Sequence, residues 1–414
     1  MDPIPALKDA TNAGIVKGLK DISGVKPRLD IDIMIWDQPD TFNLFILALD
    51  KMQKPDFQPH VLRYAGISGD DAGSGYCHHG RSTFPVWHRP YLGLLEQILF
   101  ITMVELAKQW KTTENREKYH QAALEFRLPY WDYYRPRGPR VNFPGIIENG
   151  MTSFTYDYSC PIAFTVEKIN VRTAPDDKWT AMGNPLHHWD FEKDFVPEKD
   201  WVGSKAYILD ELLYARDRTH RYPLAGKDKK PSPEMESAKL LNQVLNTLRI
   251  DSNRLALAFL LSEAYNDWDL FAPNSTPKEG YTSHTDAGYY MELKASGSLK
   301  SLHNLYHGLI GGNPKTKRGD NEEILVGGGG GHMSKVSTAA FDPVFWMHHG
   351  QVERLASIWQ AIHRGEEHSW LKKADDRELA LFPFRQSPGI AAETMWKADM
   401  LRDHETLGYT FDDI

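Results

Sequence analysis

One stretch of the chain, residues 76–96, decides the fold, and it reads YCHHGRSTFPVWHRPYLGLLE. From Pro90 the sequence continues as an apolar run to about residue 110, which predicts a long helix with a proline in its first turn. His88 opens this helix, and His79 lies in the preceding loop. Burying a polar group without a hydrogen-bond or metal partner costs free energy, so histidines beside a buried helix need such a partner.

The 17 histidines of the chain concentrate in two windows, residues 60–88 and 303–349. In the second window His303 and His307 are four residues apart, which places both imidazoles on one face of a helix and within reach of one ion. Further along, residues 341–354 read FDPVFWMHHGQVER and place histidines on a helix with an apolar first turn. A histidine buried there is expected to be a metal ligand or a hydrogen-bonded core residue.

Taken together, these stretches resemble the tyrosinase family. Residues 79–96 resemble its first metal-site signature and residues 342–349 its second; HNLYHGLIGG at 303–312, GHMS at 331–334 and FRLPYWD at 126–132 also match. The resemblance covers roughly residues 40–365. It implies a mainly α fold, a tyrosinase-like antiparallel four-helix bundle around a dinuclear metal site, with long loops and a few short strands.

Carried over residue by residue, the resemblance implies that His303, His307 and His349 hold one metal ion and that His79 and His88 hold the other. The resemblance identifies the third ligand of the site with His79 and His88 less directly. Fungal tyrosinases often carry it in an Ala-Gly-Ile-His-Gly stretch, where this chain has Ser68. Bacterial members place it on an upstream helix, a position that His60 fits; the alternative is a first site with two histidines.

Other residues of the resemblance have expected roles around the metals. Cys77 stands where fungal tyrosinases form a thioether to a ligand ring, here His79; the alternative is a buried free cysteine, as expected for Cys160. Asn304 matches the residue that tyrosinases use to hold a water. Four residues are expected to support the ligands: Trp87, Arg89, His348 and Glu353. Val336 stands at the position expected to gate the pocket.

The chain also departs from the family pattern near the second site. The Glu that partners the water-holding Asn is absent, because those positions are Lys294 and Ala295, which disfavours monophenol hydroxylation. Glu353 replaces the usual Asp, and Gly350 interrupts the helix at a cost of about 1 kcal/mol. The glycine therefore indicates a close contact or added space near the metal.

Six neutral imidazoles suit copper, zinc or iron, whereas di-iron sites usually need carboxylates. Copper is therefore the first choice and zinc the second. The resemblance implies an oxidase of o-diphenols or o-aminophenols that uses dioxygen and takes a small aromatic substrate. The alternative is a redox-silent dizinc lyase of the haemocyanin-like cyclopenase kind, in quinolone alkaloid biosynthesis. A dioxygen carrier is the third hypothesis.

Composition and length limit the remaining possibilities for partners, location and domain organisation. The chain has 414 residues and a net charge of −8, with no basic block for nucleic acid or an anionic membrane. The apolar run 92–107 is too short and too polar to span a bilayer, and no signal peptide is visible, so a cytoplasmic protein is expected. Two cysteines exclude a disulfide framework. Without a low-complexity linker, residues 1–414 are expected to form one domain, with N- and C-terminal extensions packed on the core at about 40–365.

The apolar periodicity predicts the other helices. They are expected at residues 13–19, 41–51, 56–62, 114–125, 198–215, 233–248, 254–265, 298–309 and 343–364. Between residues 128 and 197 the periodicity fades, which predicts loops with short strands.

Overall fold

The computed structural model describes residues 2–54, 57, 76–78, 81–135, 137, 160–191, 218–221, 250–263, 265–273, 297–311, 331–334 and 338–414. The α-helices are α1 (Ile4–Asn12), α2 (Lys20–Ser23), α3 (Ile31–Asp37), α4 (Pro39–Met52), α6 (Phe84–Ala107), α7 (Thr113–Glu125), α10 (Ile250–Leu260), α11 (Trp268–Phe271), α13 (Leu299–Gly311), α14 (Val344–Ile362) and α15 (Ala374–Arg377). The strands are β1 (Lys26–Arg28), β2 (Lys168–Thr173), β3 (Lys178–Gly183), β4 (Ala380–Arg385), β5 (Met395–Lys397) and β6 (Tyr409–Phe411).

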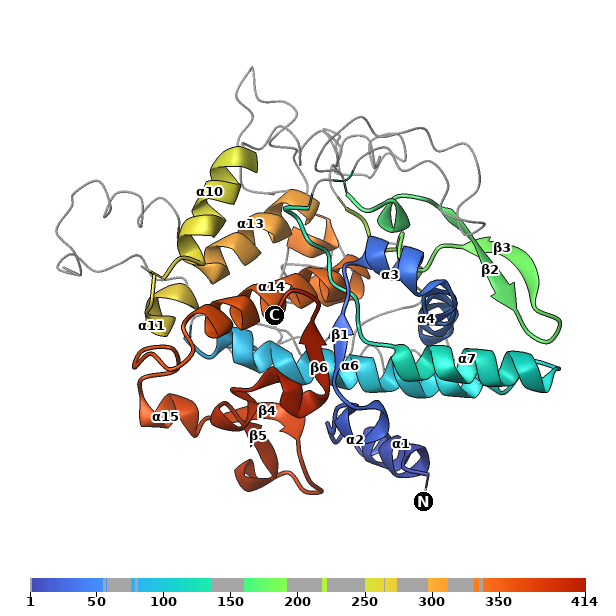
Figure 1. Ribbon diagram of the computed structural model, residues 1–414, viewed down its shortest axis with the longest axis horizontal. Coiled ribbons are helices and arrows are strands. Elements are labelled where there is room, and N and C mark those ends of the chain that lie inside the picture. The colour runs from blue at the N-terminus through green and yellow to red at the C-terminus, as the bar shows by residue number, and fades with distance from the viewer. Residues whose placement is uncertain are drawn as a thin grey trace.

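The long helix α6 is the centre of the fold. It packs against α4, α7 and α14, and α14 in turn packs against α13 (Figure 1). Its apolar window is long enough to cross a membrane, but 89% of that window is buried inside the protein, as expected of a core helix. The prediction of a mainly helical fold is confirmed.

Helix α6 begins at Phe84, well before the predicted start at Pro90. Pro85 occupies its first turn, and Pro90 lies inside the helix. A proline there removes one backbone hydrogen bond. Packing overrides this loss, because Phe84 and Trp87 are fully buried and the His88 ring adds a bond from Nδ1 to the Phe84 carbonyl, at 2.8 Å.

A helix was predicted at residues 13–19, but the structure has none there. Gly14 and Gly18 both adopt a φ of 70°, a left-handed conformation that interrupts a right-handed helix. Val16 instead donates its N–H to the Arg385 carbonyl at 2.8 Å, which attaches this segment to the C-terminal part of the chain. The helices at 41–51, 114–125, 254–265, 298–309 and 343–364 are found as α4, α7, α10, α13 and α14 with shifted ends. The segments 56–62, except for the turn residue Phe57, 198–215 and 233–248 lie outside the described residues.

Three two-stranded sheets complete the described structure. The hairpin of β2 and β3 falls in the window where short strands were expected. Strands β4 and β5 also pair antiparallel, and β1 pairs in parallel with β6, joining segments from the two ends of the sequence. Helix α1 and strand β4 each contact α6. The single domain with terminal extensions packed on its core stays a prediction.

Candidate metal centre

Helix α13 presents two histidines one turn apart. His303 and His307 lie with their ring centroids 4.3 Å apart, as the four-residue spacing predicted. Leu302, Tyr306 and Ile310 are buried on the same helix and hold it against the core. The side of α13 that faces α14 is therefore both apolar and histidine-bearing.

Helix α14 brings two more histidines to the same place. His348 and His349 are buried, and one ring nitrogen from each lies within 4.8 Å of the corresponding atoms of His303 and His307. We call these four residues the histidine cluster. His88 of α6 stacks on His349 with ring centroids 4.2 Å apart, so three helices contribute imidazoles to one buried region.

Backbone carbonyls orient two of these rings. The His88 Nδ1 lies 2.8 Å from the Phe84 carbonyl, and the His307 Nδ1 lies 2.8 Å from the Met333 carbonyl. Because a carbonyl only accepts, each Nδ1 must carry the proton and each Nε2 keeps its lone pair for a metal. Met333 belongs to the GHMS match at 331–334, so that motif supports His307 through its backbone.

The environment keeps the imidazoles neutral. Burial lowers the pKa of His88 and of His307 to about 3, and it holds the pKa values of His303, His348 and His349 well below the usual range. The nearby Lys300 ammonium adds to this effect, as does repulsion among the histidines themselves. Neutral imidazole is the protonation state that binds a metal ion.

The donor set fits a metal of the copper or zinc kind. Both ring nitrogens of His349 and the Nε2 of His348 are buried and lack a hydrogen-bond partner among the described residues. Burying such atoms unpaired costs about 1–3 kcal/mol each, a cost that a bound cation would remove. The cluster consists of imidazoles, with no carboxylate grouped with them in the described part of the chain, which suits copper or zinc.

An ion pair fastens the two ligand-bearing helices together beside the cluster. The Arg89 Nε donates to the Glu353 Oε1 at 2.8 Å, and both side chains are fully buried. Arg89 follows His88 directly and Glu353 lies one turn after His349. The pair thus fixes the distance between α6 and α14 at the level of the imidazoles, in agreement with the supporting role expected for both residues.

Trp87 and Asn304 also adjoin cluster residues. The Trp87 indole donates to the Phe382 carbonyl at 2.8 Å and anchors α6 to β4. Asn304 is exposed, and its Oδ1 lies 3.0 Å from the His303 Nδ1, so it can orient that ring. Whether Asn304 also holds a catalytic water stays a prediction.

Cys77 is buried beside the site, with its Sγ 3.5 Å from the His88 Nε2. Its expected thioether partner, His79, lies outside the described residues, as do His60 and Val336. The thioether and the ligands His60 and His79 therefore stay predictions. Cys160 is buried as expected, and burial raises the pKa of its thiol to about 12, which makes it unreactive.

Gly350 marks a close contact. A Cβ added there would lie 3.1 Å from the Tyr130 Cβ and 3.2 Å from the Pro129 carbonyl oxygen. The chain at 129–131 is pressed onto α14, and the Trp131 N–H donates to the Met347 carbonyl at 3.1 Å. The glycine therefore allows this segment to approach the helix that carries His349.

Two residues near the cluster were not assigned a role from the sequence. Tyr133, just beyond the FRLPYWD match, contacts His348, and the buried Lys300 lies 3.3 Å from the His303 Nδ1. The spacing of Lys300, three residues before His303 on the same helix, was the available signal. The contact of Tyr133 depends on tertiary packing, which the sequence pattern does not encode.

A family model, the common central domain of tyrosinase, matches residues 48–362. The chain belongs to the tyrosinase family. A tyrosinase of Podospora anserina is 28% identical over 406 residues, covering 90% of this chain and 59% of that protein. Polyphenol oxidase 2 of Agaricus bisporus is 27% identical over 425 residues, covering 94% of this chain and 62% of that protein.

The tyrosinase fold is shared with solved structures. Aspergillus oryzae pro-tyrosinase superposes with a TM-score of 0.73 at 23% identity, covering 96% of this chain and 70% of that one. A mushroom tyrosinase gives a TM-score of 0.66 at 24% identity, with 97% and 91% covered. The chain spans between half and two thirds of the length of most of the curated relatives it matches.

Proposed function

We propose that this protein is a dinuclear-copper oxidase that oxidises o-diphenols or o-aminophenols to the corresponding quinone-type products. Two diphenols would be oxidised for each dioxygen reduced to two waters. Buried, neutral imidazoles from three helices are the observation that carries the proposal. The tyrosinase and polyphenol oxidase names of the relatives support a phenolic substrate.

In this proposal His303, His307 and His349 hold one copper, and His88 holds the other together with His79 and His60. The bound copper pair supplies the exchange of electrons with dioxygen. The protein itself keeps the imidazoles deprotonated by burying them and orients the rings through their Nδ1 partners. It also excludes water from the cluster side of α14, whose residues 344–353 are all buried.

We expect o-diphenols to be oxidised faster than monophenols. The expectation follows from Lys294 and Ala295, which stand where the family carries a Glu to polarise the water beside Asn304. In addition, the Asn304 Oδ1 lies 3.0 Å from the His303 Nδ1. This hydrogen bond to the ring occupies the oxygen that would otherwise hold a water. A small aromatic molecule and dioxygen are therefore the proposed partners.

Elemental analysis of protein purified from its native host tests the metal, and the optical spectrum after addition of peroxide tests the oxidase chemistry. Two coppers, a peroxide-dependent absorption band and turnover of catechol are expected. His349→Asn should abolish turnover, whereas His368→Asn, at an exposed histidine, should not. Two zinc ions, no band and no turnover would remove the oxidase and direct attention to the lyase, which none of the comparisons favours.

A further inference from the structure

The Tyr133 hydroxyl contacts two different atoms of His348. Its oxygen makes a short hydrogen bond with the ring Nδ1 of His348, and it also donates to the backbone carbonyl of the same residue at 3.1 Å. Both residues are buried. One tyrosine thus holds both the ring and the main chain of a histidine that directly precedes His349.

These two contacts decide which ring nitrogen carries the proton. A phenol has one proton, and the carbonyl oxygen can only accept it, so the phenol oxygen is left to accept a proton from Nδ1. The opposite tautomer would point an N–H from Nε2 into the buried cluster, where the described residues offer it no acceptor. The His348 Nε2 therefore carries a lone pair, as the Nε2 of His307 does.

That lone pair lies among the nitrogens of the cluster. The His348 ring centroid lies 4.5 Å from that of His307, 5.1 Å from that of His303 and 5.0 Å from that of His349. One ring nitrogen of His348 lies within 4.8 Å of one ring nitrogen of each of the other three histidines. The geometry therefore provides four imidazole nitrogens where the resemblance to the family implies three.

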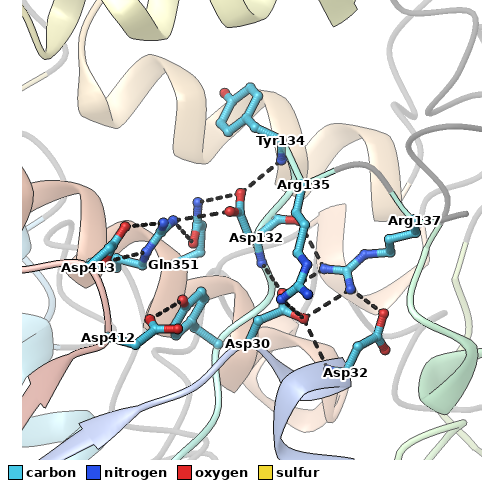
Figure 2. Close-up of polar contacts among 11 residues, drawn as sticks. Asp30, Asp32, Asp132, Tyr134, Arg135, Arg137, Gln351, Asp412 and Asp413 are labelled. Carbon is cyan, nitrogen blue, oxygen red and sulfur yellow. Dashed lines mark hydrogen bonds and ion pairs between the residues drawn. The ribbon is translucent and has the colours of Figure 1, made fainter. Parts of the chain in front are cut away.

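Tyr133 is held rigidly in its place. Its ring stacks on Tyr306 of α13, with centroids 3.5 Å apart and planes 15° from parallel. The preceding residue, Asp132, accepts a hydrogen bond from the Gln351 side chain at 3.3 Å and pairs with Arg354 at 3.3 Å, both on α14 (Figure 2). Contacts with both ligand-bearing helices thus set the position of the hydroxyl.

Charged residues fix the other side of the same segment. Arg137 pairs with Asp30 at 2.6 Å and also with Asp32, and the Asp132 N–H donates to Asp30 at 2.9 Å (Figure 2). Asp30, Asp32 and Arg137 are buried, so their ion pairs resist exchange with water. The segment cannot move away from the start of α3 without breaking these pairs and leaving a buried charge without its partner, which is costly.

We propose that His348 is a fourth imidazole donor to the ion held by His303, His307 and His349, and that Tyr133 is the positioning residue that directs its Nε2 to that ion. The inference rests on the metal centre of the proposed function. A fourth protein ligand occupies a coordination position that a catalytic ion with three protein ligands usually keeps open, so this ion would be the less accessible of the pair to dioxygen. The two ions would then differ, one held tightly by four imidazoles and the other left to meet the aromatic substrate.

Zinc titration of the metal-free full chain, in competition with a chromophoric chelator, tests the inference without depending on redox chemistry. His348→Asn keeps an amide N–H near the position of Nδ1 and removes Nε2. Tyr133→Phe removes only the hydroxyl. Tyr134→Phe is the matched control. The Tyr134 ring packs on the rings of Tyr133 and Tyr306, and its hydroxyl bonds to none of the described histidines.

We expect Tyr133→Phe to weaken the tighter zinc site about ten- to a hundredfold, the usual effect of losing a partner of a ligand. His348→Asn should weaken that site at least as much, and the double variant should match His348→Asn alone. Tyr134→Phe should leave both zinc affinities unchanged. Equal near-ultraviolet circular dichroism of the metal-free variants checks that each has folded.

Unchanged zinc affinity in His348→Asn would overturn the inference and leave the dinuclear centre intact. An effect of Tyr133→Phe that persists in the His348→Asn background would also overturn it, because Tyr133 would then act through packing alone. A wild-type chain that binds no zinc ion would instead remove the proposed metal centre, and this inference with it. If His348→Asn fails to fold, a zinc-loaded wild-type structure decides by a distance of about 2.0–2.1 Å from zinc to the His348 Nε2.

Discussion

Glu353→Gln should destabilise the protein by about 3 kcal/mol, because it removes the negative charge that compensates a buried arginine. The Glu353 Oε1 accepts hydrogen bonds from Arg89 at 2.8 Å and from Ser357 and Tyr409 at 3.1 Å. A glutamine can still accept these bonds, so the loss is chiefly electrostatic. Breaking a buried ion pair by removing one partner costs about 3–5 kcal/mol. We take the lower end because Arg89 keeps oxygen partners, among them Gln360.

The measurement is urea unfolding of the metal-free chain, followed by tryptophan fluorescence. The matched control is Glu378→Gln, which breaks the pair of Glu378 with Lys397. That pair has a similar distance of 2.7 Å, but the glutamate side chain is 64% exposed, so a loss of about 0–1 kcal/mol is expected. A Glu353→Gln variant that loses no more stability than Glu378→Gln would refute the reasoning.

A double replacement separates charge from shape. Arg89→Met with Glu353→Leu removes both charges, so neither is left buried alone. The double variant should lose clearly less stability than the sum of Arg89→Met and Glu353→Leu measured singly. Additive losses would show that the ion pair contributes little beyond packing.

Three further outcomes are expected. Burial holds the pKa of His88 and of His404 at about 3 against a usual 6.5, so the unfolded chain binds more protons between these values. The metal-free protein should therefore lose stability as the pH falls through this range, by up to about 1.4 kcal/mol per pH unit for each such histidine, and His404→Gln should reduce that slope in urea titrations at successive pH values. Gly350→Val should cost about 1–3 kcal/mol in urea unfolding, because its side chain would press on the adjoining backbone. Copper loading in air, with dioxygen as the oxidant, should remove the mass of two hydrogens from the wild-type chain but not from Cys77→Ala, if Cys77 bonds to His79; an unchanged wild-type mass would contradict the thioether.

Local spacing predicted one part of the candidate site, and the resemblance to the tyrosinase family implied the rest. The pair His303 and His307 follows from helical periodicity alone, and their rings meet as expected. The sequence also indicated that Gly350 marks a close contact or added space; the structure shows a close contact, with Tyr130 and Pro129, which the sequence could not name. Such partners come from segments far apart in the sequence, which no local pattern specifies.

The fold shows the same division between local and distant causes. Helices such as α4 and α14 were predicted to within a few residues, since their apolar faces are continuous. Strand β1 was missed, because three residues carry no recognisable alternation and its partner β6 lies near the other end of the chain. The start of α6 was misplaced because Pro90 is tolerated within a helix that packing stabilises.

The parallel pairing of β1 with β6 has a consequence for biosynthesis. Lys26 lies opposite Tyr409, and Arg28 lies opposite Phe411 with its guanidinium 3.5 Å above the Tyr409 ring. Residues up to Phe411 must therefore leave the ribosome before β1 can find its partner. Until then Arg28, which pairs with Glu96 at 3.0 Å, lacks its aromatic neighbour Tyr409. Copper delivered before that point would meet a chain in which β1 is still unpaired.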